Sequence, residues 1–165
     1  MKKLLLLLVA LALPHLVWGQ LQFRATLSGS NEVPPRETPA FGVAHASLDL
    51  GSKLFTFNHT FEGLVATQTG AHIHLAPAGV NGPVIYPIAL GSPASLLLTL
   101  TDDDVAALRG GNWYVNVHSA TYPGGEIRGQ FVPVPEPSTY ALGAALLIGI
   151  AVAWRRRRLL VHTPA

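Results

Sequence analysis

Two histidines flank a single isoleucine in the stretch AHIHL, and this spacing can place two metal ligands side by side. In a β-strand, residues two apart point to the same face, so His72 and His74 should share a face while Ile73 turns to the other. Two imidazoles on one face can bind an ion when a neighbouring strand supplies a third ligand. The chemistry therefore depends on which strand lies beside this one.

A third histidine stands near the end of the run WYVNVHS. Apolar and polar residues alternate in this run, which places His118 on its polar face. Three imidazoles without a thiolate suit copper or zinc. A carboxylate could join them, either as a fourth ligand or as the group that orients an imidazole. The sequence thus predicts a metal site made of His72, His74 and His118, with Glu126 and Glu32 as candidate carboxylates.

The same histidines have a simpler interpretation. Outward-facing imidazoles are ordinary on an antiparallel sheet, and two histidines around one residue are a weak motif by themselves. In this alternative they form a solvated or hydrogen-bonded polar face. His59 shares its face with three phenylalanines in LFTFNHTF, so we expect it to be buried in a structural role and not to bind metal.

Alternating runs of this kind dominate the middle of the chain, separated by Gly, Pro, Asn and Ser. They read as about eight short strands, beginning with LQFRATLSG and ending with EIRGQFV. One piece, TDDDVAALRGG, is typical of a helix, with Thr101 as its cap and Gly110 at its end. The pattern predicts an all-β fold, an antiparallel β-sandwich with Greek-key connections.

The N-terminus, MKKLLLLLVALALPHLVWGQ, has the parts of a secretory signal peptide. Lys2 and Lys3 precede an unbroken apolar run, and Gly19 is a small residue at a suitable cleavage position. We therefore expect signal peptidase to remove residues 1–19, and a single domain to occupy residues 21–133.

Residues 134–165 form a separate C-terminal segment. Its uncharged stretch from Tyr140 to Trp154 is followed by Arg155, Arg156, Arg157 and Arg158. Fifteen helical residues reach only about 22 Å, short of a hydrocarbon core of about 30 Å. We expect this segment to form a marginal transmembrane helix, with its arginines snorkelling to the cytoplasmic side. The signal peptide at the N-terminus would form a second short helix. Everything between the two ends would then lie outside the inner membrane.

Charge and cysteine content exclude some functions for the middle of the chain. Between Leu21 and Pro133 there are five basic and eight acidic residues, a net charge of −3. Such a domain has no electrostatic footprint for nucleic acid. Cysteine is absent, so no disulfide supports the fold and the hydrophobic core must do so alone.

The C-terminal segment resembles the PEP-CTERM sorting signal of Gram-negative bacteria. The matching parts are Pro135, Glu136 and Pro137, then a short apolar helix, then the four arginines. This resemblance implies that an exosortase-type membrane peptidase processes the tail near the Pro-Glu-Pro motif. It also implies delivery to the cell surface or outside, with transient anchoring in the inner membrane. The alternative is an ordinary C-terminal membrane anchor.

Three blocks of the middle segment resemble a CHRD domain, the module named after chordin. They are LSGSNEVPP, the AHIH strand with its NGPV turn, and NWYVNVHSATYPGGEIRGQ. The resemblance implies a compact β-sandwich of superoxide-dismutase-like or immunoglobulin-like architecture in a secreted or surface protein. A copper–zinc dismutase would need further histidines and an aspartate in the loop after the HxH strand. The loop LAPAGVNGP has neither, so the zinc half of such a site is missing.

Two classes of function remain open from the sequence. The first is a non-catalytic binding or matrix protein of the envelope, which would bind polysaccharide or another envelope component through the loops 31–35 and 76–83. The alternative is a copper- or zinc-binding module, with redox chemistry open to it. An enzyme is the less expected outcome, because Ser119 and His118 are adjacent strand residues and point to opposite faces.

Overall fold

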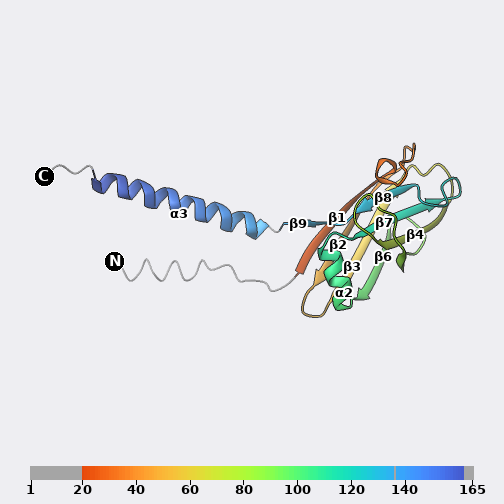
Figure 1. Ribbon diagram of the computed structural model, residues 1–165, viewed down its shortest axis with the longest axis horizontal. Coiled ribbons are helices and arrows are strands. Elements are labelled where there is room, and N and C mark those ends of the chain that lie inside the picture. Colours follow the sequence, from red (N-terminus) through yellow and green to blue (C-terminus); the bar gives the residue numbers. More distant parts are fainter. Residues whose placement is uncertain (1–19, 136, 162–165) are drawn as a thin grey trace. The chain divides into compact units, whose positions relative to one another are not determined.

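The computed structural model describes residues 20–135 and 137–161 (Figure 1). The signal peptide expected over residues 1–19 lies outside these residues, as does Glu136 of the Pro-Glu-Pro motif. Among the described residues, 20–134 form one compact unit, and 135 and 137–161 belong to a second. The two units are described separately below.

The larger unit is a nine-stranded sheet in which every described pair of strands is antiparallel. Its strands are β1 (Gln20–Ser28), β2 (Phe41–Asp49), β3 (Leu54–Glu62), β4 (Gln68–Leu75), β5 (Val84–Pro87), β6 (Ala94–Thr99), β7 (Trp113–Ser119), β8 (Ile127–Gln130) and β9 (Val132–Val134). Their order is β5-β4-β7-β8-β1-β2-β3-β6, and β9 also pairs with β1. The predicted all-β antiparallel class is confirmed, while the Greek-key connections of a sandwich stay a prediction.

The sheet curls around one hydrophobic core (Figure 1). Along β1, the core-facing residues Phe23, Ala25 and Leu27 alternate with polar ones, as a half-buried strand requires. Aromatic rings join distant strands across the core, since Phe55 of β3 meets the Trp113 ring of β7 edge-on at 5.6 Å. Burying one such side chain contributes about 1.5–3 kcal/mol, so the core can hold the fold without disulfides.

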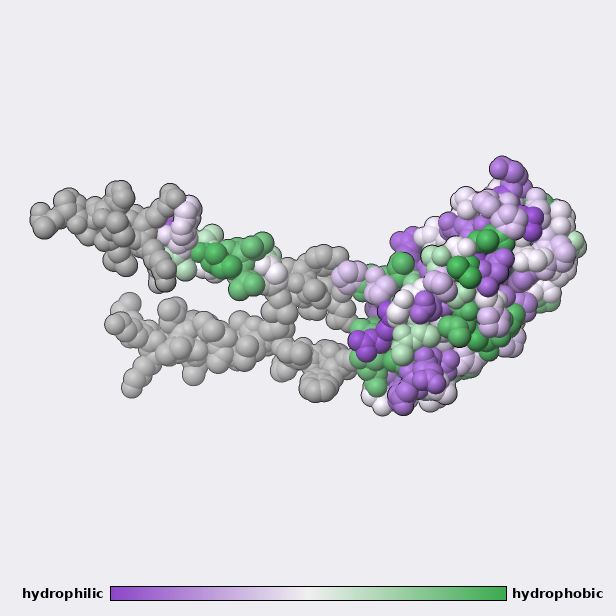
Figure 2. Space-filling model, in the orientation of Figure 1, coloured by the Kyte–Doolittle hydropathy of each residue, from purple (hydrophilic) through white to green (hydrophobic). Residues whose placement is uncertain are grey.

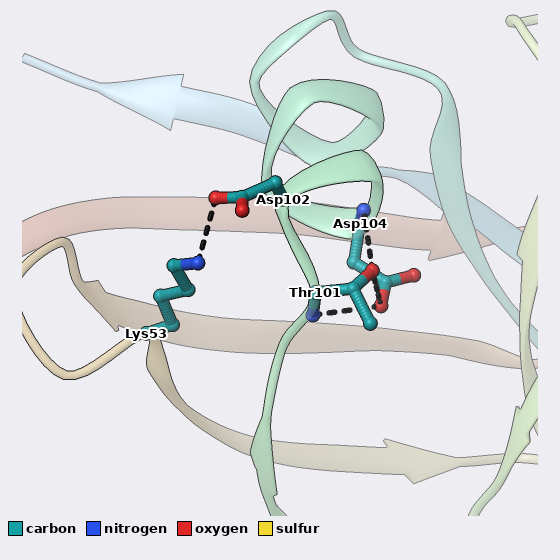
Figure 3. A network of polar contacts seen from close by, with 4 residues as sticks. All are labelled: Lys53, Thr101, Asp102 and Asp104. Atoms are coloured by element: carbon teal, nitrogen blue, oxygen red, sulfur yellow. Dashed lines mark hydrogen bonds and ion pairs between the residues drawn. The ribbon is translucent and has the colours of Figure 1, made fainter.

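The predicted helix is present as α2 (Asp102–Arg109), with Thr101 as N-cap and Gly110 as C-cap. Thr101 and Asp104 form a reciprocal capping box, in which each side chain bonds the other residue's backbone N–H (Figure 3). Asp102 pairs with Lys53 at 2.7 Å (Figure 3), but both side chains are exposed and the pair stabilises little. This acidic cluster is therefore a helix start and not a functional site. A short 3₁₀ turn, η1 (Gly29–Asn31), follows β1.

The second unit contains α3 (Pro137–Val161), whose exposed apolar side chains form a hydrophobic stretch (Figure 2). They include Leu146, Leu147, Ile148 and Ile150. No helix within the described residues is long and apolar enough to cross a membrane. The transmembrane helix that we expected in this segment is therefore not supported. The physical reason is length, because the uncharged stretch measures about 22 Å before the arginines begin.

Deleting residues 135–165 should leave the thermal midpoint of the β unit unchanged, because the unit ends with β9 and all the core residues that the structure describes lie before residue 135. Extending the deletion to residue 132 provides the matched control. It removes β9 and its pairing with Gln22, Phe23 and Arg24, and should lower the midpoint. Differential scanning calorimetry of the two truncated chains checks this. A large fall on removing residues 135–165 alone would show that the tail packs on the domain.

Candidate metal centre

Strands β4 and β7 are neighbours, and their register sets the geometry of the candidate site. His72 lies opposite Asn116, and His118 lies opposite Gly70. Directly opposed residues of an antiparallel pair share a face, so the three histidines project from the same side of the sheet. Ile73 points to the other side, where it is fully buried in the core. The strand pairing thus brings His118 to two histidines that lie 44 and 46 residues before it in the sequence.

The three imidazoles converge closely. Each of His72, His74 and His118 offers one ring nitrogen, and these three atoms all lie within 4.8 Å of one another. Nδ1 of His72 is 3.1 Å from Nε2 of His118. Two nitrogens bound to one tetrahedral zinc at about 2.0–2.1 Å lie about 3.3 Å apart, so this pair already has nearly the spacing of two metal ligands.

Backbone carbonyls fix the tautomers of two of these rings. Nδ1 of His74 is 3.0 Å from the carbonyl oxygen of Gly82, and Nδ1 of His118 is 3.0 Å from that of Pro123. A carbonyl only accepts, so in each neutral ring Nδ1 carries the proton and Nε2 carries the lone pair. Metal-binding histidines are commonly held in this way, with the second nitrogen donating to a carbonyl or carboxylate. His72 can then donate from Nδ1 to the lone pair of His118.

Burial keeps the cluster neutral. Desolvation is the largest cause that lowers the pKa of each of the three histidines below the ordinary value of 6.5. The Gly82 and Pro123 carbonyls oppose this shift at His74 and His118, while the neighbouring histidines add to it. Near neutral pH the rings therefore present lone pairs, and no proton has to be displaced from an imidazolium before a metal binds.

Burial argues against the solvated interpretation for two of the three rings, because His74 is 8% and His118 9% exposed, whereas His72 is only partly buried. Loops cover the face and bond to its side chains, as the Pro123 and Gly82 carbonyls show. The hydrogen-bonded interpretation accounts for both Nδ1 atoms but not for Nε2 of His74. That atom is buried and has no partner. A buried lone pair beside two other imidazoles is what a metal ion would satisfy.

Three residues that support the cluster were not recognised in the sequence. The ring of Tyr114 stacks on that of His74 with their centroids 4.7 Å apart, and the guanidinium carbon of Arg128 lies over the Tyr114 ring, 3.4 Å from its centroid. The Tyr114 hydroxyl accepts from the N–H of Gly82, whose carbonyl holds His74. From the sequence alone, Gly82 could be interpreted only as part of a turn. Nothing in it showed that the turn folds back onto β4.

The two candidate carboxylates do not join the group of three histidines. Glu126 is fully buried, and its Oε1 accepts hydrogen bonds from the Thr38 hydroxyl and from the N–H of Val65. Glu32 lies against Asn116, whose amide nitrogen is 3.4 Å from its Oε2. Within the described residues, the metal-ligand cluster contains the three imidazoles alone. If these rings held a tetrahedral ion, its fourth ligand would have to be water or an external group.

Glu32 should make stability depend on pH. Burial raises the pKa of its carboxyl from 4.5 to about 7, with Arg128 and Arg36 opposing the shift. The folded state then binds a proton that the unfolded state has lost, so this contribution is complete below about pH 4.5 and disappears as pH rises through about 7. Relative to Glu32→Gln, the unfolding free energy of the wild type should fall by about 3 kcal/mol between pH 4 and pH 8.

Urea unfolding of both proteins at several pH values measures this difference. The exposed Glu62→Gln is the matched control and should show no such trend. The histidines do not confound the comparison, because their own loss of stability below about pH 6.5 occurs in both proteins and cancels. A flat difference between wild type and Glu32→Gln would contradict the assigned protonation.

The chain thus combines an antiparallel β domain with a Pro-Glu-Pro segment and an apolar helix that carries four consecutive arginines. These are the parts of an exported and sorted protein. The sequence matches the CHRD domain over residues 23–131 and the PEP-CTERM protein-sorting motif over residues 133–158. The chain therefore belongs to the CHRD domain family. No curated protein and no solved structure matches it. The sorting motif implies processing by an exosortase-type peptidase and export to the cell surface or beyond, with transient anchoring by the C-terminal segment.

Proposed function

We propose that this exported CHRD domain binds one copper or zinc ion through His72, His74 and His118. The observation that carries the proposal is the convergence of one ring nitrogen from each of the three histidines within 4.8 Å, in a cluster where Nε2 of His74 is buried without a partner. Two of the rings are held by carbonyls in the tautomer that a metal requires. A surface whose histidines had no such role would not need this arrangement.

The three histidines would have different roles in binding an ion. His74 and His118 are fixed by Gly82 and Pro123, and His72 is the more accessible third ligand, because its side chain is only partly buried. A neutral His72 ring has one N–H and one lone pair, so binding through Nδ1 would require only that its proton move from Nδ1 to Nε2, with no net release of a proton near neutral pH. A bound copper ion would supply one-electron redox chemistry, and a bound zinc ion would act as a Lewis acid.

The broader role that fits the sorting motif is that of a binding or matrix protein at the cell envelope. We propose this role without catalysis, and it does not compete with the metal site. A metal ion can serve such a protein as a structural or ligand-binding centre. The sorting motif supports a site of action outside the inner membrane for either proposed function.

Metal analysis of the full chain, purified without a polyhistidine tag, tests the proposal. After exposure to zinc or copper and removal of the excess, we expect about one ion per chain by inductively coupled plasma mass spectrometry. Binding should weaken as pH falls below about 6.5, when the unbound histidines begin to protonate. A folded protein that retains neither ion above the level of a buffer blank would refute the metal site.

A further inference from the structure

A groove of about 500 Å³ is lined by residues of β1, η1, β8 and β9 and of the loop after β4, and none of the three histidines lines it. The 3₁₀ turn and the residues after it form one wall, the loop around Ala78 and Gly79 forms another, and β8 with β9 forms the floor. Asn81 ties the two loops together, because its amide nitrogen donates to the Val33 carbonyl at 2.8 Å. Cavities of this size are typical of sites for small molecules.

Two hydrogen-bond acceptors among the residues that line this groove have no partner. Oε1 of Glu32 is buried without one, and the whole Glu32 side chain is only 4% exposed. Oε1 of Gln130 is also buried and has no hydrogen-bond partner. The amide nitrogen of the same side chain donates to the carbonyls of Ala76 and Gly111. An unpaired buried acceptor is costly, so both side chains would gain by turning toward a ligand in the groove that brings donors.

The charges of the groove argue against an ionic ligand. The Arg128 guanidinium is near Glu32 and is itself held by the Val80 carbonyl and the Asn81 side-chain oxygen, at 2.7 and 3.2 Å. A cation would be opposed by Arg128, while an anion would find the Arg128 donors already bonded to Val80 and Asn81 and would lie beside a Glu32 carboxyl that loses its proton as pH rises through about 7. The other residues that line the groove have short uncharged side chains, such as Ser30, Val33 and Val132. Hydroxyl donors together with C–H surface match this lining.

We propose that the groove binds a neutral sugar unit of a polysaccharide. A sugar ring carries hydroxyl groups that can donate to Glu32 and Gln130, and C–H faces that can lie against Val33 and Val132. This proposal does not depend on the metal site, since none of the three histidines lines the groove. It gives the exported domain a ligand of the kind found outside the cell.

The test uses the full chain in a detergent without a sugar headgroup, and saturation-transfer NMR with three sets of tetrasaccharides. The neutral set is cellotetraose, maltotetraose and mannotetraose, the acidic probe is a tetra-uronate, and the basic probe is a tetra-glucosamine. We expect at least one neutral probe to bind, and to bind at least tenfold more tightly than the acidic and basic probes. Binding should be unchanged by a chelator.

Two variants locate the site. Glu32→Ala should weaken binding at least tenfold, and Val132→Trp should block the groove from its exposed rim without removing a buried group. Glu62→Ala, at an exposed glutamate that lines a different cleft, should leave binding unchanged. The proposal is overturned if no neutral probe binds, if a charged probe binds best, or if Val132→Trp binds as well as the wild type.

Discussion

Replacing His72 with alanine should lower the affinity for zinc and for copper at least about 100-fold, because loss of a ligand costs more than the 10–100-fold typical of a lost outer-shell partner. The metal-free protein should be destabilised by only about 1 kcal/mol. His72 is the more exposed of the three histidines, and it makes one hydrogen bond, to His118. Competition titrations with a chromophoric chelator measure the affinity, and urea unfolding of the metal-free protein measures the stability.

His45→Ala is the matched control, since His45 is an exposed histidine on β2 and remote from the cluster in the strand order. It should bind both ions as the wild type does. Equal losses in the two variants would mean that exposed histidines bind the ions non-specifically. No loss in His72→Ala would remove His72 from the site.

Gly82→Ala should destabilise the protein by about 3 kcal/mol and also weaken metal binding. A Cβ at this position would lie 1.9 Å from the carbonyl oxygen of Leu75, so the backbone of the loop must move away from β4. That movement withdraws the carbonyl that holds His74 and the N–H that bonds Tyr114. The expected loss of affinity is about 10–100-fold, the usual cost of removing a second-sphere partner.

Gly124→Ala provides the comparison, because a Cβ there would meet nothing within 4 Å. Its thermal midpoint and its zinc affinity should both match those of the wild type. If Gly82→Ala unfolds at the wild-type midpoint and keeps full affinity, then the contact between this turn and β4 does not hold His74 in place.

The strand content of the chain could be predicted because each strand carries its own period-two pattern. LFTFNHTF alone shows which side of β3 faces the core, and TDDDVAALRGG contains both ends of α2. These signals are local, and they need no knowledge of the rest of the fold. The same local reasoning placed His72 and His74 on one face, opposite Ile73.

The surroundings of the histidines could not be predicted, because they come from loops that fold over the sheet. Nothing in GVNGPV indicates that the Gly82 carbonyl reaches His74, or that Asn81 bonds Val33 some 48 residues away. The carboxylates were misplaced for the same reason. We proposed Glu126 as a ligand because carboxylates commonly bind metals, whereas in the fold it accepts hydrogen bonds from Thr38 and Val65. Long-range contacts of this kind leave no periodic signal in a single sequence.

The most direct test of the metal site is an anomalous diffraction map of crystals of the zinc-loaded protein, recorded above and below the zinc absorption edge. We expect one strong peak, about 2.0–2.1 Å from a ring nitrogen of each of His72, His74 and His118. The Nδ1 atoms of His74 and His118 should still donate to the Gly82 and Pro123 carbonyls. A map with no peak among these three rings, or with its peak at another residue, would contradict the account.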